Sequence, residues 1–199
     1  MQITVDKKSG IFISIIALLL VVITVLAVNT QGRHKNGEMK SSMGMHNHGG
    51  SSLTGSDVMF LQMMIPHHQQ AVEMSDLALA KSKDKDVLTL AKQIKDAQSL
   101  EITQMKSWLR AANEGPDMGH SMDHGMGGML DEEEMSALAA SSAGVFDKLF
   151  LQGMINHHEG ALHMVTMIED SQDPQIRKLG LDITKSQTAE IALMKELLG

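Results

Sequence analysis

The sequence predicts an all-α protein: an up-down-up-down four-helix bundle built from two copies of one helical hairpin, preceded by an N-terminal transmembrane helix. The strongest observation is an internal repeat. Residues 57–74 and 147–164 are identical at ten of eighteen positions at a constant offset of 90. Residues 94–109 return as 183–198 at an offset of 89, with seven shared positions. A unit of two segments that occurs twice predicts two equivalent hairpins.

The second observation is the spacing of apolar residues inside each repeat. In the first copy they recur every three or four residues, which places them on one face of a helix. The members of this stripe are Phe60, Met64, His67, Ala71, Met74 and Ala78, and in the second copy Phe150, Met154, His157, Ala161, Met164 and Ile168. Aromatic residues at 3% and only three prolines argue against a β-sandwich. Short polar turns at 81–84 and around Asp173-Pro174 make neighbouring helices antiparallel, which gives the bundle.

The N-terminal segment Ile11–Val28 contains eighteen residues without a charge. This length reaches the lower limit for crossing a bilayer. Lys7 and Lys8 precede it, so residues 1–10 are expected to stay in the cytoplasm and the rest to be exported. We therefore expect a single-pass membrane protein with its bundle on the periplasmic or extracellular side. A cleaved signal peptide is the alternative.

The remaining chain divides into a linker and the bundle. Residues 29–55 are rich in Gly, Ser, Asn and Met and have no apolar period. Within the bundle, 56–199, the first hairpin is expected at 56–112, a Met- and His-rich loop at 113–130, and the second hairpin at 131–199.

Three local signals refine the helices. Pro66 lies inside the first His-His helix, where a kink is expected because proline removes a backbone hydrogen bond. Asp131 and Glu134 have the spacing of a capping box and predict a short helix. Gly144 is expected to break that helix before the second His-His helix begins.

Composition excludes several function classes. The formal net charge is −7 and no basic stripe is present, so nucleic-acid binding is not expected. The chain has no cysteine, which excludes disulfides, a cysteine nucleophile and cysteine zinc sites. It contains 18 methionines and 10 histidines. No phosphate loop, dinucleotide fingerprint or nucleophile motif accompanies them.

Polar residues fall on the stripes that should face the bundle interior. A buried carboxylate needs a partner, so histidine across the interior or a metal ion held by imidazole is expected beside each glutamate. These candidate residues are His67, His68, His157, His158, Glu101 and Glu190. Core histidines that bond only to glutamate or glutamine are the structural alternative.

Methionine supplies the second class of candidate ligand. Met64, Met74, Met154 and Met164 flank the histidines at helical spacing, although methionine also fills helical cores without any ligand role. Thioether sulfur selects Cu(I) and Ag(I), whereas imidazole binds either oxidation state of copper. Glycine-rich segments hold further candidates that core packing does not explain, unless they are only low-complexity linkers. These candidates are Met43, Met45, His46, His48, Met118, His120, Met122, His124, Met126 and Met129.

The two His-His segments and the two Gln-x-x-Glu-Ile segments resemble the family called domain of unknown function 305, over Ser56 to the C-terminus. The resemblance implies a ferritin-like fold and makes His67, His68, His157 and His158 hallmark positions. It also implies copper or silver binding, because some exported members bind these ions and contribute to metal tolerance. The Glu-x-x-His pattern of di-iron sites is absent, so an iron oxidase is not implied.

The expected function is a membrane-anchored, exported binder of copper, as Cu(I) or Cu(II), and of silver, serving sequestration, tolerance or handover. Its expected partners are the metal ions and the membrane, with an export partner unidentified. A copper-dependent redox enzyme and a metal-free tethered interaction bundle are the alternatives. Loop thioether sites are expected to bind almost independently of pH. Bundle histidine sites are expected to weaken as pH falls through about 6.5, the ordinary histidine pKa.

Overall fold

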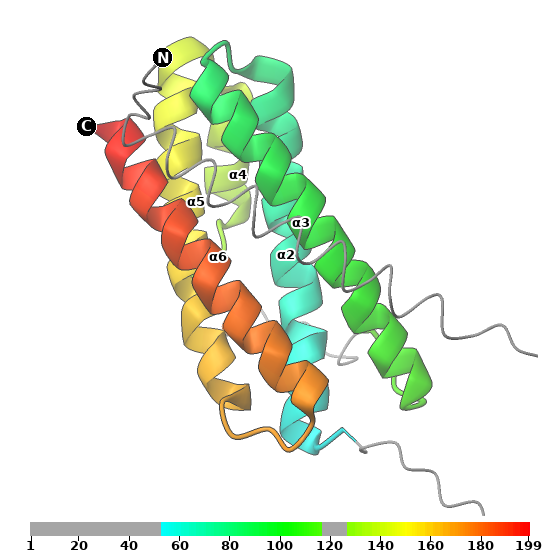
Figure 1. Cartoon of the computed structure of the whole chain (residues 1–199). Helices are drawn as coiled ribbons and strands as arrows, with labels where there is room; N and C mark the ends of the chain where they lie inside the picture. Colours follow the sequence, from blue (N-terminus) through cyan, green and yellow to red (C-terminus); the bar gives the residue numbers. More distant parts are fainter. Residues whose placement is uncertain (1–52, 117–126) are drawn as a thin grey trace, which may run out of the picture. The chain divides into compact units, whose positions relative to one another are not determined.

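The computed structural model describes residues 53–116 and 127–199, and within these two ranges the chain is helical with no strand. Helices α2 (Gly55–Lys81) and α3 (Lys85–Ala111) form the first hairpin. Helices α5 (Ala143–Val165) and α6 (Pro174–Leu198) form the second. The four long helices make the predicted four-helix bundle (Figure 1).

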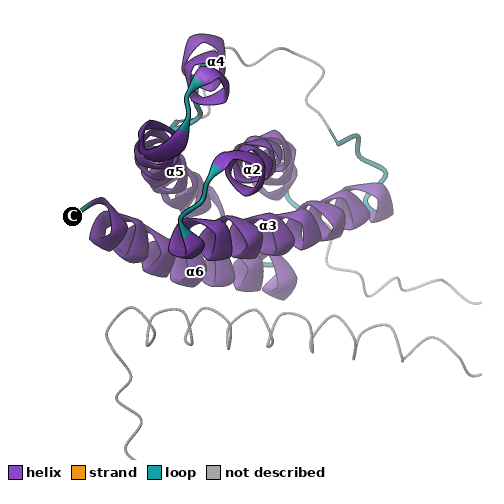
Figure 2. Ribbon diagram, turned by 90° about the horizontal axis from the view of Figure 1, so that it is seen from above, coloured by secondary structure: helices purple, strands orange, loops and turns teal. Residues whose placement is uncertain are grey.

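The two His-His helices lie at the centre of the arrangement. Helix α2 packs against α3 and α5, and α5 packs against α6, so the two hairpins meet along α2 and α5 (Figure 2). Two smaller elements complete the fold. The short helix α4 (Glu132–Ala140) packs on α5, and the 3-10 turn η1 (Thr166–Ile168) extends the end of α5 toward α2 and α6. Residues on α2 and α5 that face each other therefore come from equivalent places in the repeat.

The helix starts follow from side-chain caps. Asp84 and Asp173 accept hydrogen bonds from the first backbone amides of α3 and α6. Pro174 occupies the first turn of α6, where a backbone N–H would have no partner inside the helix, so its missing N–H costs nothing. The predicted capping box of Asp131 and Glu134 is confirmed at the start of α4. Each such cap is worth about 1 kcal/mol of helix stability.

The expected helix break at Gly144 is wrong. Helix α5 already begins at Ala143 and runs through Gly144, and the break lies at Ser141 and Ser142, whose backbones are extended. The Ser141 hydroxyl donates to the Leu138 carbonyl at 2.8 Å, so a serine cap, rather than glycine, ends α4. Pro66 does not end its helix, because α2 continues as one helix from Gly55 to Lys81.

The core is formed by the predicted apolar stripes. Phe60, Met64, Ala71, Met74 and Ala78 of α2 are all fully buried, and the equivalent residues of the second copy, on α5 and η1, are buried as well. Burying a side chain of phenylalanine or methionine size contributes about 1.5–3 kcal/mol. These contacts hold α2 and α5 rigidly enough to fix the direction of the polar residues on the same faces.

No helix in the described part of the chain is long and apolar enough to span a bilayer. The predicted transmembrane segment Ile11–Val28 and residues 29–52 of the predicted linker 29–55 lie outside the described residues.

Candidate metal centre

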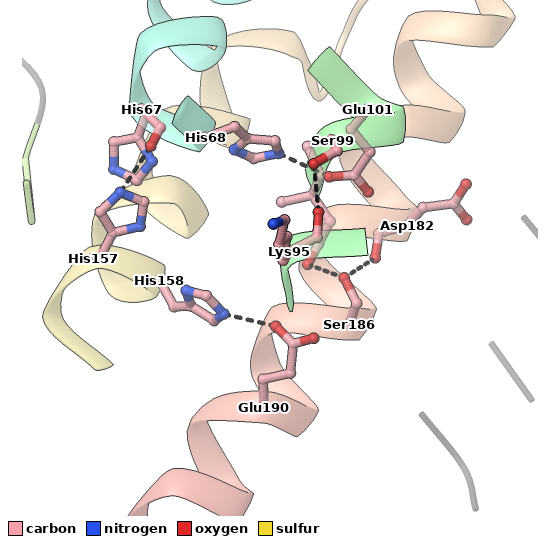
Figure 3. A network of polar contacts seen from close by, with 11 residues as sticks. His67, His68, Lys95, Ser99, Glu101, His157, His158, Asp182, Ser186 and Glu190 are labelled. Atoms are coloured by element: carbon pink, nitrogen blue, oxygen red, sulfur yellow. Dashed lines mark hydrogen bonds and ion pairs between the residues drawn. The ribbon is translucent and has the colours of Figure 1, made fainter. Parts of the chain in front are cut away.

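Four histidines meet where α2 and α5 pack against each other. His67 and His68 come from α2, His157 and His158 come from α5, and all four side chains have 0% exposure (Figure 3). We call these four residues the histidine quartet. Fully buried histidine is unusual unless its polar atoms are satisfied or used, so the ring nitrogens decide what the quartet can do.

His67 and His157 stack across the junction of the two helices. Their ring centroids lie 3.8 Å apart with planes tilted by 39°. The Nε2 of His157 donates to the backbone carbonyl of His67 at 2.9 Å, and the Nε2 of His67 donates to the carbonyl of Gly127 at 3.3 Å. A carbonyl only accepts hydrogen bonds, so both rings carry the proton on Nε2 and leave a lone pair on Nδ1 when they are neutral.

His68 and His158 each hydrogen bond to a glutamate of their own hairpin. The Nε2 of His68 donates to Glu101 on α3 at 2.7 Å, and the Nε2 of His158 donates to Glu190 on α6 at 2.6 Å (Figure 3). The glutamates are thus satisfied by histidine, one of the two partners that the sequence predicted. A carboxylate that holds one nitrogen of an imidazole fixes the ring and raises the basicity of the other nitrogen.

The apolar stripes contain His67 and His157, but the sequence did not show which histidine each glutamate would meet. The structure pairs the glutamates with the other two histidines, His68 and His158. Adjacent residues project about 100° apart, so His67 turns toward the other hairpin while His68 turns toward α3.

Burial keeps the stacked pair uncharged. Removal from water lowers the pKa of His67 to about 3, with nearby His68 and His158 lowering it further and the Gly127 carbonyl opposing them. Burial is also the largest cause that holds the pKa of His157 well below its usual value, and the neighbouring quartet histidines lower this pKa further. The expected loss of metal affinity through pH 6.5 therefore does not apply to His67 and His157. Both rings are already neutral in that range and have no proton on Nδ1 to release before they bind a metal ion.

The Nδ1 atoms of all four quartet histidines are buried and have no hydrogen-bond partner among the described residues. Leaving such an acceptor unpaired costs about 1–3 kcal/mol, and here the cost recurs four times. A metal ion is the group that imidazole lone pairs most commonly hold. Imidazole nitrogen suits copper among the transition metals. In the described ranges, no group of three or more His, Asp or Glu is placed to hold a metal ion.

The predicted methionine ligands fall into three sets. Met64, Met74, Met154 and Met164 are buried in the apolar core of the bundle. Met129 is half-buried and follows the glycine pair beside His67. The remaining candidates of the loop and linker lie outside the described residues: Met43, Met45, His46, His48, Met118, His120, Met122, His124 and Met126.

Two further groups beside the quartet were not recognised in the sequence. The backbone of Gly127–Leu130 lies against His67, and Gln70 and Gly160 hold it there. The internal repeat of the sequence carried a signal for these two residues. Gln70 and Gly160 are equivalent at the offset of 90, yet one is a long amide and the other has no side chain, in a segment where the repeat is otherwise well kept.

Comparison with known proteins finds a matching family profile and similar solved structures. The family profile described as "Domain of unknown function (DUF305)" matches residues 57–198, whereas no curated protein matches the chain. A DUF305 fragment from Deinococcus radiodurans is 32% identical with a TM-score of 0.69, covering 74% of this chain and 97% of that one. A DUF305 protein from Streptomyces coelicolor is 32% identical with a TM-score of 0.68, covering 72% and 90%.

A third similar structure carries metal. CopM in its Cu(I)-bound form is 34% identical, with a TM-score of 0.60, and the match covers 71% of this chain and 94% of CopM. CopM is also known in Cu(II)-bound, silver-bound and apo forms. These similarities confirm the family resemblance and the helical bundle.

Proposed function

The chain belongs to the DUF305 family, and from this premise we propose that it binds Cu(I) and Ag(I) at the histidine quartet. The observation that carries the proposal is the set of four buried Nδ1 atoms that have no partner in the described part of the chain, on rings whose opposite nitrogens are already hydrogen bonded. The similarity to CopM, which binds copper and silver, supports the choice of ions.

The chemistry of the quartet favours monovalent soft ions. Cu(I) and Ag(I) bind with few donors, so imidazole lone pairs can hold them without a carboxylate ligand. The stacked pair is neutral, which removes the competition between proton and metal that ordinary histidines have near neutral pH. Glu101 and Glu190 would strengthen His68 and His158 as donors through their Nε2 protons.

We further propose that the ion is cargo, held for sequestration, tolerance or handover, by a protein tethered through Ile11–Val28 on the exported side of the membrane. The Met- and His-rich segments 39–48 and 117–129 would add thioether sites for the same ions. Thioether and imidazole together, without cysteine, suit an oxidising compartment, where thiolates form disulfides.

Titration of the full-length protein with Ag(I), followed by ¹⁵N NMR of histidine side chains, tests the proposed site. We expect the Nδ1 resonances of His67, His68, His157 and His158 to shift, while their Nε2 nitrogens keep their protons, because only Nδ1 is free to coordinate. Exposed His163 on α5 serves as the internal control. If silver moved only histidines outside the quartet, the proposed site would be wrong.

The proposed topology has its own test. Protease added to spheroplasts is expected to digest the chain beyond residue 30, because Lys7 and Lys8 hold the N-terminus in the cytoplasm. Immunoblots against the N-terminus and against the bundle measure the outcome, with a cytoplasmic protein as the control for leakage. Full protection of the bundle would contradict the orientation.

A further inference from the structure

A short backbone segment closes one side of the quartet. We call Gly127–Leu130 the strap. Its first residue accepts the His67 Nε2 hydrogen bond at 3.3 Å. Its last residue is held by Gln70 on α2, whose side-chain amide donates to the Leu130 carbonyl at 2.8 Å and accepts from the Leu130 amide at 2.7 Å. The strap is therefore anchored three residues beyond His67 and touches His67 itself.

Two glycines allow the strap to pack closely against α5. Together with the Gln70 hydrogen bonds, these glycine contacts form what we call the seat of the strap. A Cβ atom added to Gly160 on α5 would lie 1.7 Å from the carbonyl oxygen of Gly127. One added to Gly128 would lie 2.2 Å from the Asn156 carbonyl oxygen, and Gly128 also has a φ of +84°, which favours glycine. Backbone thus packs directly on backbone, and any side chain at these positions would lift the strap away from α5.

The seat uses equivalent positions of the two repeats. Gln70 follows His67 by three residues and Gly160 follows His157 by three, so both lie one helical turn beyond the stacked histidines. Gln70 contributes the two hydrogen bonds to Leu130, which we call the clamp, and Gly160 contributes the space that the strap occupies. His157 needs no such device, because its Nε2 donates to a carbonyl within the rigid helix α2. Only His67 depends on a segment outside the helices for its hydrogen bond.

We infer that Gln70 and Gly160 are positioning residues of the quartet, which act by seating the strap so that the Gly127 carbonyl holds the proton of His67 on Nε2 and leaves Nδ1 free for the ion. This inference rests on the proposed function for its effect on metal binding. The effect on the tautomer of His67 is independent of metal. Residues that hydrogen bond to a metal-binding histidine alter affinity about ten- to hundred-fold when they are lost.

The test uses two variants of the full-length protein that displace the strap in different ways. Gly160→Ala adds a methyl group that would collide with the carbonyl oxygen of Gly127. Gln70→Leu removes both clamp hydrogen bonds without adding bulk. Gly144→Ala is the control for the first, since nothing lies within 4 Å of its added Cβ on the same helix. Gln69→Leu, at an exposed neighbouring position, is the control for the second.

In the metal-free protein, ¹⁵N NMR is expected to show His67 exchanging between its two tautomers in both strap variants and fixed on Nε2 in both controls. Silver affinity of the quartet should fall about ten-fold in the strap variants alone. An unchanged His67 tautomer in both strap variants would overturn the inference, as would a changed tautomer with unchanged silver affinity. If the wild-type quartet bound no silver, the proposed function would fall, while the tautomer would still show whether the strap positions His67.

Discussion

Silver affinity is expected to fall about ten- to hundred-fold when Glu101 and Glu190 are both replaced with glutamine. Each carboxylate accepts the Nε2 proton of a quartet histidine, at 2.7 Å for His68 and 2.6 Å for His158. Glutamine keeps the shape and one accepting oxygen but loses the charge that strengthens the opposite nitrogen as a donor. Competition titration of the full-length variant with a silver chelator near pH 7.5 measures the change.

The matched control is the double substitution of Glu132 and Glu133 with glutamine. Both are exposed on α4, so the same loss of two charges occurs away from the quartet. We expect silver affinity there to change less than about two-fold, because exposed charges are screened by water and salt. Equal effects of the two double variants would show that Glu101 and Glu190 act only through net charge.

Stability of the metal-free protein is expected to decrease steeply on mild acidification. The folded pKa of His67 is about 3, below its unfolded value near 6.5, so between these values the unfolded chain binds a proton that the folded protein excludes. Stability is therefore complete above pH 6.5 and is lost as pH falls toward 3. From pH 6.5 to 5, His67 accounts for about 2 kcal/mol, and His157 adds a loss of the same sign.

Urea unfolding at pH 7 and pH 5 measures this loss. The variant with His67 and His157 both changed to glutamine should show a much smaller difference between the two pH values, whatever its stability at pH 7. Replacing exposed His163 with glutamine is the control and should leave the difference as it is in the wild type. A pH difference that persisted in the His67 and His157 variant would mean that other groups cause the acid sensitivity.

The bundle could be predicted from the sequence because its determinants are local and periodic. The stripe that begins at Phe60 and its copy at Phe150 define the buried faces, and the caps at Asp131 and Asp173 fix where helices begin. Duplication strengthened each signal by showing it twice. The error at Gly144 arose because glycine is tolerated in a first turn, while the two preceding serines supplied the break.

The detail of the metal centre could not be predicted in the same way. Helical periodicity says that both His67 and His68 lie near the interior, but it does not say which neighbour each ring faces, since that depends on how the hairpins dock. The Gly127 contact joins residues 60 positions apart through a loop backbone, which leaves no periodic trace in the sequence. Side-chain identity predicted the donors, and tertiary packing decided their partners.

The hydrogen bond between His157 and His67 joins residues 90 positions apart, and this separation has a consequence for folding. Each hairpin can form through local contacts across a turn of a few residues, which is fast for helical proteins. The stacked pair exists only after both finished hairpins have docked along α2 and α5. An ion bound by both members of that pair would therefore act by mass action on the docking step, favouring assembled hairpins over separated ones.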